Sequence, residues 1–524
     1  MSKEKKITYV TLLSDESIHG EYESALERVE KELGHHHPIF INGDERWTGS
    51  EFVARSPVDN EMITGYFQDG TEVEVNESIL ASKGGFPGWS GHDWQTRAAI
   101  IRKTADRLDE KRFVLSALVT LECGKNRYEA IAEVSEGIDM LRYYCEIYEQ
   151  NEGYIRPTRS EIGGEHCRSV MRPYGVWAVI SPFNFPVTLA AGMIGAALLT
   201  GNCVVFKPTS ETPLSGLTLY RAFRESGVPG SAIQFFTGPG RIFGEAVTRH
   251  PDIEGIAFTG SREVGMWLHQ ALSTRAGYVK PLVAEMGSKN PCIVTSSADI
   301  AKAAEGTAMA AFGYSGQKCS ATSRVYVQSD VFDQFCTALC ERAKALQIGD
   351  PRRKETFMGP LINRNAFEVF KSSVAQCRSE GGIVLAGGDV QSGEMMSRGY
   401  YVQPTIVTKI PRGHRLVRDE LFVPFLVLDT FTSLGEALAE ANNTEYGLTA
   451  GIFSEDEEEL ETFFETIRFG VCYSNRSGGA TTGAWPGAQS FGGWKGSGST
   501  GRGVGGPYYL LSFLREQAQT RVVP

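Results

Sequence analysis

Residues 175–286 constrain the fold more strongly than any other stretch, because short apolar runs alternate there with amphipathic segments. Strands that alternate with helices form a parallel sheet with helices on both faces. The expected helices fall between the expected strands, which lie near 176–180, 203–207, 233–236, 255–258 and 281–284. A second alternating series runs from 291 to about 474, so the sequence predicts an α/β fold with two such domains.

Two segments lie outside these series. Residues 154–172 alternate as a polar hairpin with a turn at Gly163-Gly164, and such a ribbon has too little core to fold alone. We expect it to pack on another domain or subunit. The glycine-rich tail ends in an expected edge strand at 508–514.

Charge and composition exclude several classes of protein. The net charge of −11 and the pI near 5.5 argue against a nucleic-acid partner. The uncharged stretch between Arg172 and Lys207 is broken by prolines, so we expect no membrane span. Ten scattered cysteines without a CxxC pair indicate neither zinc nor disulfides and favour a reducing cytoplasm, and we expect no metal site. The polar N-terminus lacks the apolar core of a secretory signal.

One cysteine, Cys319, lies in a loop of small and polar residues directly before a β-rich run. Glycines in this loop allow a backbone amide to approach a ligand, and Lys318 supplies a nearby positive charge. A thiolate nucleophile needs these conditions. Taken alone, the loop fits a structural turn with an incidental thiol equally well.

Polar residues that follow strands of the first series are candidate partners, because ligands bind where the strands of a parallel sheet end. An amide such as Asn184 can donate to a developing oxyanion, and burial of Glu285 would raise its pKa toward that of a useful base. Gly260 precedes a helix start, which favours a pyrophosphate. The structural alternatives are a capping turn for Asn184, an ion pair with Lys289 for Glu285, and a surface position for Lys207.

Together these stretches resemble the aldehyde dehydrogenase superfamily over essentially 38–514. The spacing between Glu285 and Cys319 is the family's usual one. The matching motifs, in the family's order, are 181–186, 206–213, 258–265, 285–291, 316–319, 420–422 and 491–493.

The resemblance implies a Rossmann-type dinucleotide-binding domain (1–153 and 173–287), an α/β catalytic domain (288–490) and a β-hairpin oligomerisation arm (154–172 and 491–524). It therefore implies a homo-oligomer, a dimer or larger, that acts on a small aldehyde with NAD.

The same resemblance implies roles for individual residues. Cys319 is the nucleophile, and Asn184 with the Cys319 amide forms the oxyanion hole. Hydride passes to the nicotinamide, and water directed by Glu285 releases the acid from the thioester. The residues implied to bind the dinucleotide are Ser181, Lys207, Ser210, Gly260, Ser261, Glu420 and Phe422.

Within the superfamily, the loop at Cys319 is most similar to that of 1-pyrroline-5-carboxylate dehydrogenases, which oxidise L-glutamate γ-semialdehyde to L-glutamate. By this resemblance Ser320, Gly496 and Ser497 hold the amino-acid head of the substrate, and Phe185 borders its aliphatic stem. A hydroxyl and backbone N–H groups suit an α-carboxylate. Two alternatives stay open: another carboxylated aldehyde, such as succinate or 2-oxoglutarate semialdehyde, and a non-catalytic dinucleotide-binding protein.

Several positions depart from the family pattern. Ser288 stands where the subgroup has a second glycine, Val423 replaces another glycine, and residues 477–488 differ from the usual sequence before Phe491. Ser210 stands where many NAD-preferring relatives carry a glutamate. The missing carboxylate removes repulsion against a 2′-phosphate, which leaves room for some use of NADP.

Overall fold

The computed structural model describes residues 9–12, 16–275, 277–393, 395–477 and 482–522. The first alternating series forms a seven-stranded sheet in the order β12-β11-β8-β9-β10-β2-β3. Its parallel strands are β8 (Val176–Ile180), β9 (Cys203–Lys207), β10 (Ile233–Phe235), β11 (Ile253–Thr259) and β12 (Leu282–Glu285). Ile180 pairs with Lys207, and Thr259 pairs with Glu285, so the carboxyl ends of these strands meet at one edge.

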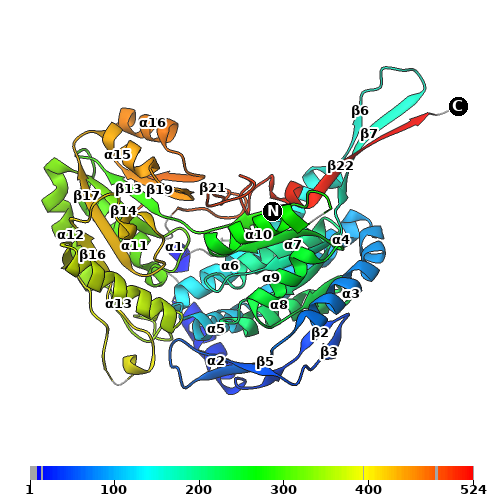
Figure 1. Ribbon diagram of the computed structural model, residues 1–524, viewed down its shortest axis with the longest axis horizontal. Helices are drawn as coiled ribbons and strands as arrows, with labels where there is room; N and C mark the ends of the chain where they lie inside the picture. Colours follow the sequence, from blue (N-terminus) through cyan, green and yellow to red (C-terminus); the bar gives the residue numbers. More distant parts are fainter. Residues whose placement is uncertain (1–8, 13–15, 276, 394, 478–481, 523–524) are drawn as a thin grey trace.

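Helices pack against the strands of this sheet, and most of them are labelled in Figure 1. They are α3 (Glu72–Gly91), α4 (Trp94–Glu110), α5 (Arg112–Cys123), α6 (Arg127–Gln150), α7 (Thr188–Leu199), α8 (Pro213–Ser226), α9 (Gly240–Arg249) and α10 (Arg262–Arg275). Every residue of α7 is buried, which explains why this helix is apolar on all sides. Among the described residues, no helix combines the length and the apolar character needed to cross a membrane.

The N-terminal region packs on the same domain. Helix α2 buries Tyr22 and Val29, and β2 and β3 extend the first sheet, whereas β1, β5 and β4 form a small sheet of their own. These elements are α1 (Tyr9–Leu12), α2 (Ile18–Lys31), β1 (His36–His37), β2 (Ile39–Ile41), β3 (Asp44–Arg46), β4 (Glu51–Arg55) and β5 (Ile63–Gln68).

The second series forms a second seven-stranded sheet, in the order β15-β16-β17-β14-β13-β19-β20, so the prediction of two α/β domains is confirmed. The strands are β13 (Asn290–Val294), β14 (Thr322–Gln328), β15 (Ile383–Ala386), β16 (Thr405–Thr408), β17 (Phe425–Phe431), β19 (Thr449–Phe453) and β20 (Val471–Ser474). The helices are α11 (Ile300–Phe312), α12 (Phe332–Ala345), α13 (Arg364–Ser379), α14 (Arg415–Arg418), α15 (Leu434–Asn442) and α16 (Glu457–Thr466).

The predicted polar hairpin projects from the body together with the C-terminal strand (Figure 1). This ribbon consists of β6 (Ile155–Thr158), β7 (Glu165–Pro173) and β22 (Leu514–Val522). The edge strand predicted at 508–514 is wrong, because the 3-10 helix η5 (Tyr509–Phe513) occupies most of that stretch and β22 begins only at Leu514. Tyr509 and Phe513 are one helical turn apart, and both are buried against aromatic rings of the first domain.

Short elements complete the chain. They are the two-stranded pair β18 (Tyr446–Gly447) and β21 (Trp494–Lys495), and the 3-10 helices η1 (Glu152–Tyr154), η2 (Gly313–Gly316), η3 (Ser329–Val331) and η4 (Met396–Arg398).

Candidate active site

Cys319 and Glu285 meet where the two domains face each other. Glu285 is the last residue of β12 in the first domain, and Cys319 lies in the turn between η2 and β14 in the second. The Cys319 Sγ donates to Glu285 Oε1 over 3.5 Å. A thiol therefore lies in direct contact with a carboxylate from the other domain.

Burial decides the protonation of this pair. It raises the pKa of Glu285 to about 7, and burial followed by the charge of Glu285 raises the pKa of the Cys319 thiol well above its usual value. The nearby positive charge expected from Lys318 is present in the cavity wall, but its Nζ forms an ion pair with Glu129. Both groups therefore hold a proton more tightly than they would in water, and Glu285 accepts the hydrogen bond of the thiol.

The alternative ion pair between Glu285 and Lys289 is also wrong. The Lys289 Nζ donates instead to the carbonyl of Leu416, in helix α14, at 2.9 Å. Burial lowers the pKa of this lysine to about 7. Glu285 is therefore not neutralised by the nearest lysine in the sequence.

A cavity of about 230 Å³ opens on Cys319. Ser320 and Phe185 line it as the sequence predicted, and α6 supplies one wall. The apolar part of the lining includes Met140, Phe185, Leu189, Met309, Phe357, Trp485, Phe491 and Val504. The charged part is Lys125, Glu129, Glu133, Glu136, Glu285, Lys318 and Arg476.

One ion pair within this wall is completely buried. The Lys125 Nζ lies 2.6 Å from Glu133 Oε2 and 3.6 Å above the ring of Phe185. Glu133 also accepts the N–H of Val187 at 3.0 Å, next to the start of α7. A buried pair of this kind is costly to break by removing one partner, so it fixes the position of Phe185.

Two other charged groups of the wall face the cavity differently. Arg476 forms no hydrogen bond or ion pair with another described residue through its side chain, although its Nε is buried. Its guanidinium packs directly against Gly483, where a Cβ would come within 2.4 Å of Cζ and where φ is +71°. Burial raises the pKa of Glu136 to about 8. The cavity thus offers a cation that has no counter-ion among the described residues, and a carboxyl group whose pKa is raised.

Asn184 is buried in the turn between β8 and α7, next to Phe185. It is not among the residues that line the cavity, but its neighbour Phe185 is. The alternative, in which Asn184 belongs to a helix-capping turn, is not supported. The N-cap residue of α7 is Val187, which makes no side-chain cap, and its N–H donates to Glu133.

The prediction that Gly496 and Ser497 face the substrate is wrong. Ser497 is fully buried, and its Oγ donates to the carbonyl of Gly287 at 2.7 Å and accepts the N–H of Gly447 at 3.0 Å. The Gly496 N–H donates to the carbonyl of Glu445 at 2.8 Å. Both residues therefore connect the tail by hydrogen bonds to the segments that contain Gly287 and 445–447.

The described residues 482–486, with Gln489, line the cavity instead. Sequence reasoning missed these residues and Arg476. The available signal was the departure from the family pattern within 477–488, directly before Phe491. A stretch that differs there changes the wall beside the nucleophile.

A second, open groove of about 750 Å³ lies beside the start of α10. Gly260 and Ser261 stand between β11 and this helix, and the Ser261 Oγ accepts the N–H of Val264 at 3.3 Å. The groove is lined by Ser261, Arg262, Glu263, Arg418, Asp419, Glu420 and residues 442–446. The free N–H groups of a helix start suit phosphate oxygens.

Glu420 borders this groove and lies close enough to Cys319 to raise the pKa of the thiol. Its carboxylate accepts the N–H of Ser288 at 2.7 Å, and a Cβ at Gly287 would come within 2.1 Å of it. Burial raises the pKa of Glu420 to about 7. A carboxylate in this position suits the hydroxyls of a ribose. Phe422, with φ of +57°, places its ring 5.8 Å from that of Phe183.

The other residues predicted to bind the dinucleotide differ in exposure. Lys207 is buried, so the surface alternative is wrong; its Nζ donates to the carbonyl of Pro208 at 2.9 Å, and burial lowers its pKa to about 8. Ser181 is buried and Ser210 is exposed. The groove itself combines a helix start with the carboxylate of Glu420, and both groups suit a dinucleotide, whereas Lys207 and Ser181 are buried outside its lining.

Comparison with known proteins agrees with this geometry. Residues 46–518 match the aldehyde dehydrogenase family. The chain is 34% identical to a 1-pyrroline-5-carboxylate dehydrogenase of Geobacillus sp. (strain WCH70) and 35% identical to one of Bacillus cytotoxicus, with 95% of each chain covered in both cases. It is also similar to the crystal structure of 1-pyrroline-5-carboxylate dehydrogenase from Thermus with bound NAD, with a TM-score of 0.93, 32% identity and 97% of each chain covered.

Proposed function

Because the chain belongs to the aldehyde dehydrogenase family, we propose that it oxidises L-glutamate γ-semialdehyde, the open form of 1-pyrroline-5-carboxylate, to L-glutamate with NAD. The observation that carries this proposal is the 3.5 Å contact between Cys319 Sγ and Glu285 Oε1, both of which line the cavity. The names of the relatives support the choice of aldehyde.

The chain's own groups act on the substrate in sequence. Cys319 Sγ adds to the aldehyde carbon as its proton passes to Glu285, while the Asn184 amide and the Cys319 N–H donate to the oxygen that gains charge. NAD, when bound, accepts the hydride that leaves this carbon. Glu285, once it has released the first proton to solvent, takes a second from a water molecule that attacks the resulting thioester. Glutamate leaves, and the thiol is restored.

Arg476 and Glu136 suit the amino-acid head of this substrate. The guanidinium of Arg476 makes no ion pair within the part of the chain that the structure describes, and a guanidinium binds a carboxylate through two parallel hydrogen bonds. Glu136 lies in the same wall and can accept hydrogen bonds from an α-ammonium group, which would favour its charged form. Ser320, beside Cys319, supplies a hydroxyl between the head and the reacting carbon.

A panel of aldehydes tests the proposal. We expect kcat/KM to be highest for L-glutamate γ-semialdehyde, compared with succinate semialdehyde, 2-oxoglutarate semialdehyde and propanal. In the Arg476→Gln variant, kcat/KM for the amino-acid aldehyde should fall about 10- to 100-fold, because one charge-assisted hydrogen-bonded pair is lost. For propanal, which has no carboxylate, we expect a change of less than about two-fold.

Two outcomes of the panel would contradict the proposal. A wild-type preference for succinate or 2-oxoglutarate semialdehyde would make one of these the substrate. An equal loss on propanal would show that Arg476 supports the fold of the cavity and does not contact the head.

Running the panel with NAD and NADP in parallel also tests the cofactor. Ser210 carries no charge that repels a 2′-phosphate, and the carboxylate of Glu211 accepts a hydrogen bond from Asn363, so we propose weaker use of NADP beside NAD.

We further propose that residues 1–153 and 173–287 bind the dinucleotide and that 288–490 carry the nucleophile. In the same proposal, 154–172 and 491–524 form an oligomerisation arm. The ribbon of this arm exposes the apolar side chains of Ile162 and Val522, and its outer strands β6 and β22 offer edges for pairing with another chain.

Light scattering coupled to size exclusion tests the arm. The full chain is expected to elute as a dimer or a larger assembly, because an exposed apolar ribbon with two strand edges is otherwise an aggregation hazard. A monomer at micromolar concentration would contradict this assignment.

A further inference from the structure

The side-chain amide of Asn290 contacts the backbone of the nucleophile itself. Asn290 begins β13 and is fully buried. Its Nδ2 lies 2.7 Å from the carbonyl oxygen of Cys319 and 2.9 Å from that of Ala321, and its Oδ1 accepts the N–H of Thr449 at 3.0 Å. One side chain therefore joins the start of β13, the turn before β14 and the start of β19.

Asn290 is connected to both reacting groups: it contacts the backbone of Cys319, and it lies five residues after Glu285 in the chain. The segment 285–290 carries Glu285 at one end and Asn290 at the other, and Ser288 within it places its Oγ 3.0 Å from Asn290 Nδ2. Rotation of the backbone at Cys319 would move its carbonyl, its N–H and its Sγ together. An amide that holds the carbonyl therefore restricts where the thiol points.

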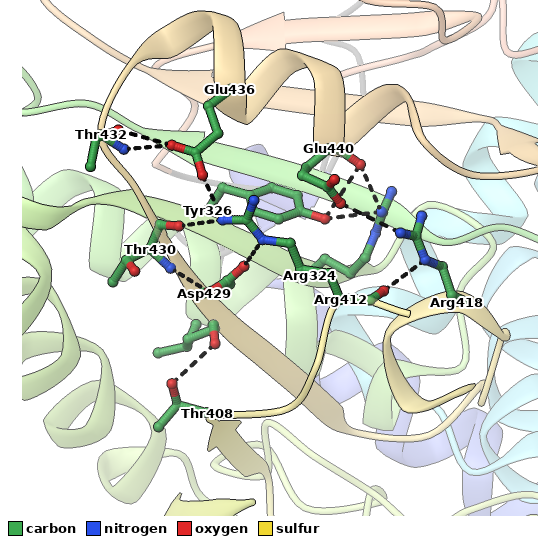
Figure 2. A network of polar contacts seen from close by, with 11 residues as sticks. Arg324, Tyr326, Thr408, Arg412, Arg418, Asp429, Thr430, Thr432, Glu436 and Glu440 are labelled. Carbon is green, nitrogen blue, oxygen red and sulfur yellow. Dashed lines mark hydrogen bonds and ion pairs between the residues drawn. The ribbon is translucent and has the colours of Figure 1, made fainter. Parts of the chain in front are cut away.

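The residue before Asn290 is also held in place by hydrogen bonds, which limits movement of the backbone at Asn290. Arg324, on β14, is fully buried and donates to the carbonyl of Lys289 through Nη2 at 2.7 Å and Nε at 3.1 Å. Figure 2 shows the neighbouring network, in which Glu440 of α15 meets Arg324, Tyr326 and Arg418.

We propose that Asn290 is a positioning residue for Cys319: its amide holds the Cys319 carbonyl so that the thiol faces Glu285 and the Cys319 N–H keeps its direction. Asn290 touches neither reacting atom, so its effect is on geometry. A displacement of about 1 Å at a reacting group lowers the rate by up to about 100-fold. The kinetic part of this inference rests on the proposed function, whereas the reactivity of the thiol can be measured without any aldehyde.

The test is Asn290→Ser, which keeps one donor on a shorter side chain. We expect kcat to fall about ten-fold or more, with KM for the aldehyde changed by less than about two-fold, because the defect lies in the alignment of the nucleophile. Alkylation of Cys319 by iodoacetamide, followed by mass spectrometry of its peptide, should lose the pH dependence that Glu285 gives it in the wild type.

Asn202→Ser is the matched control. Asn202 is also fully buried, donates to Thr200 Oγ1 and to the carbonyl of Phe513 at 2.9 Å each, and accepts the N–H of Tyr174. It should lower the Tm by a similar amount and leave the alkylation of Cys319 unchanged.

A second variant tests the same inference if Asn290→Ser does not fold. Asn290→Asp keeps the size and the acceptor for Thr449 but turns an oxygen toward the Cys319 carbonyl, and it should lower kcat at least as much. The inference is overturned if a folded variant at 290 keeps kcat within two-fold and the wild-type alkylation profile. It is also overturned if Asn202→Ser changes both readouts equally. If no aldehyde is oxidised by the wild type but the alkylation profile still depends on Asn290, the proposed function fails and the positioning role stands.

Discussion

Replacing Cys319 by alanine is expected to abolish aldehyde oxidation, lowering kcat by about 10⁴-fold or more, because the covalent route through the thioester is lost. The change removes one sulfur atom beside an existing cavity, so the fold should persist. Dinucleotide binding, measured by quenching of protein fluorescence, should stay within about two-fold of the wild-type affinity, since the groove is formed by other residues.

Cys336→Ala is the control for this experiment. Cys336 is also a free, partly exposed thiol in the second domain, on the distant helix α12. Its loss should leave kcat unchanged. Retention of more than about a tenth of the activity in Cys319→Ala would exclude covalent catalysis by this residue.

Replacing Glu285 by glutamine is expected to lower kcat by about 10²- to 10⁴-fold, the usual contribution of a general base. Glutamine keeps the shape of the side chain but cannot accept a proton. Because release of the acid needs this base, mixing the variant with substrate and NAD should form at most about one equivalent of NADH per site before turnover stops.

The pH profile gives an independent test of the same residue. Burial raises the pKa of Glu285 to about 7, and a base must be deprotonated to act. The wild-type kcat should therefore rise with pH through about 7 and level off above it. The rise should be absent in Glu285→Gln. A variant that keeps it would assign the titration to another group, and Glu420, with a pKa raised to about 7, would be the first to examine.

Local patterns were sufficient for the architecture. The alternation of apolar runs and amphipathic segments is a property of neighbouring residues, and it predicted both sheets and most of their strands. It missed β15 and β16 of the second sheet and the helix α13 before them. Where a short apolar run was ambiguous, the prediction failed. The run from Tyr509 to Phe513 has the spacing of a helical turn, and only its burial against Trp177 and Tyr144 distinguishes it from a strand.

The reacting pair was predictable for a different reason. Glu285 ends a strand and Cys319 precedes another, and strand ends are fixed by topology once the strands are known. Their roles came from the resemblance to a family. Their protonation did not, because the pairing of Lys318 with Glu129 and the desolvation of Cys319 depend on residues distant in sequence.

The sequence by itself determined the fold class and the family, and it led to the proposed pair of Cys319 and Glu285, since these follow from periodicity and from motifs in order. Only the tertiary structure decided which residues of this region line the cavity. The hydroxyl of Ser497 is hydrogen-bonded to Gly287 and Gly447, whereas Arg476 lines the cavity and makes no ion pair with the residues that the structure describes. Both lie in the same glycine-rich region, where neither period nor propensity sets the direction of a side chain. Contacts with residues distant in sequence set the direction of these side chains, and no local sequence pattern predicts such contacts.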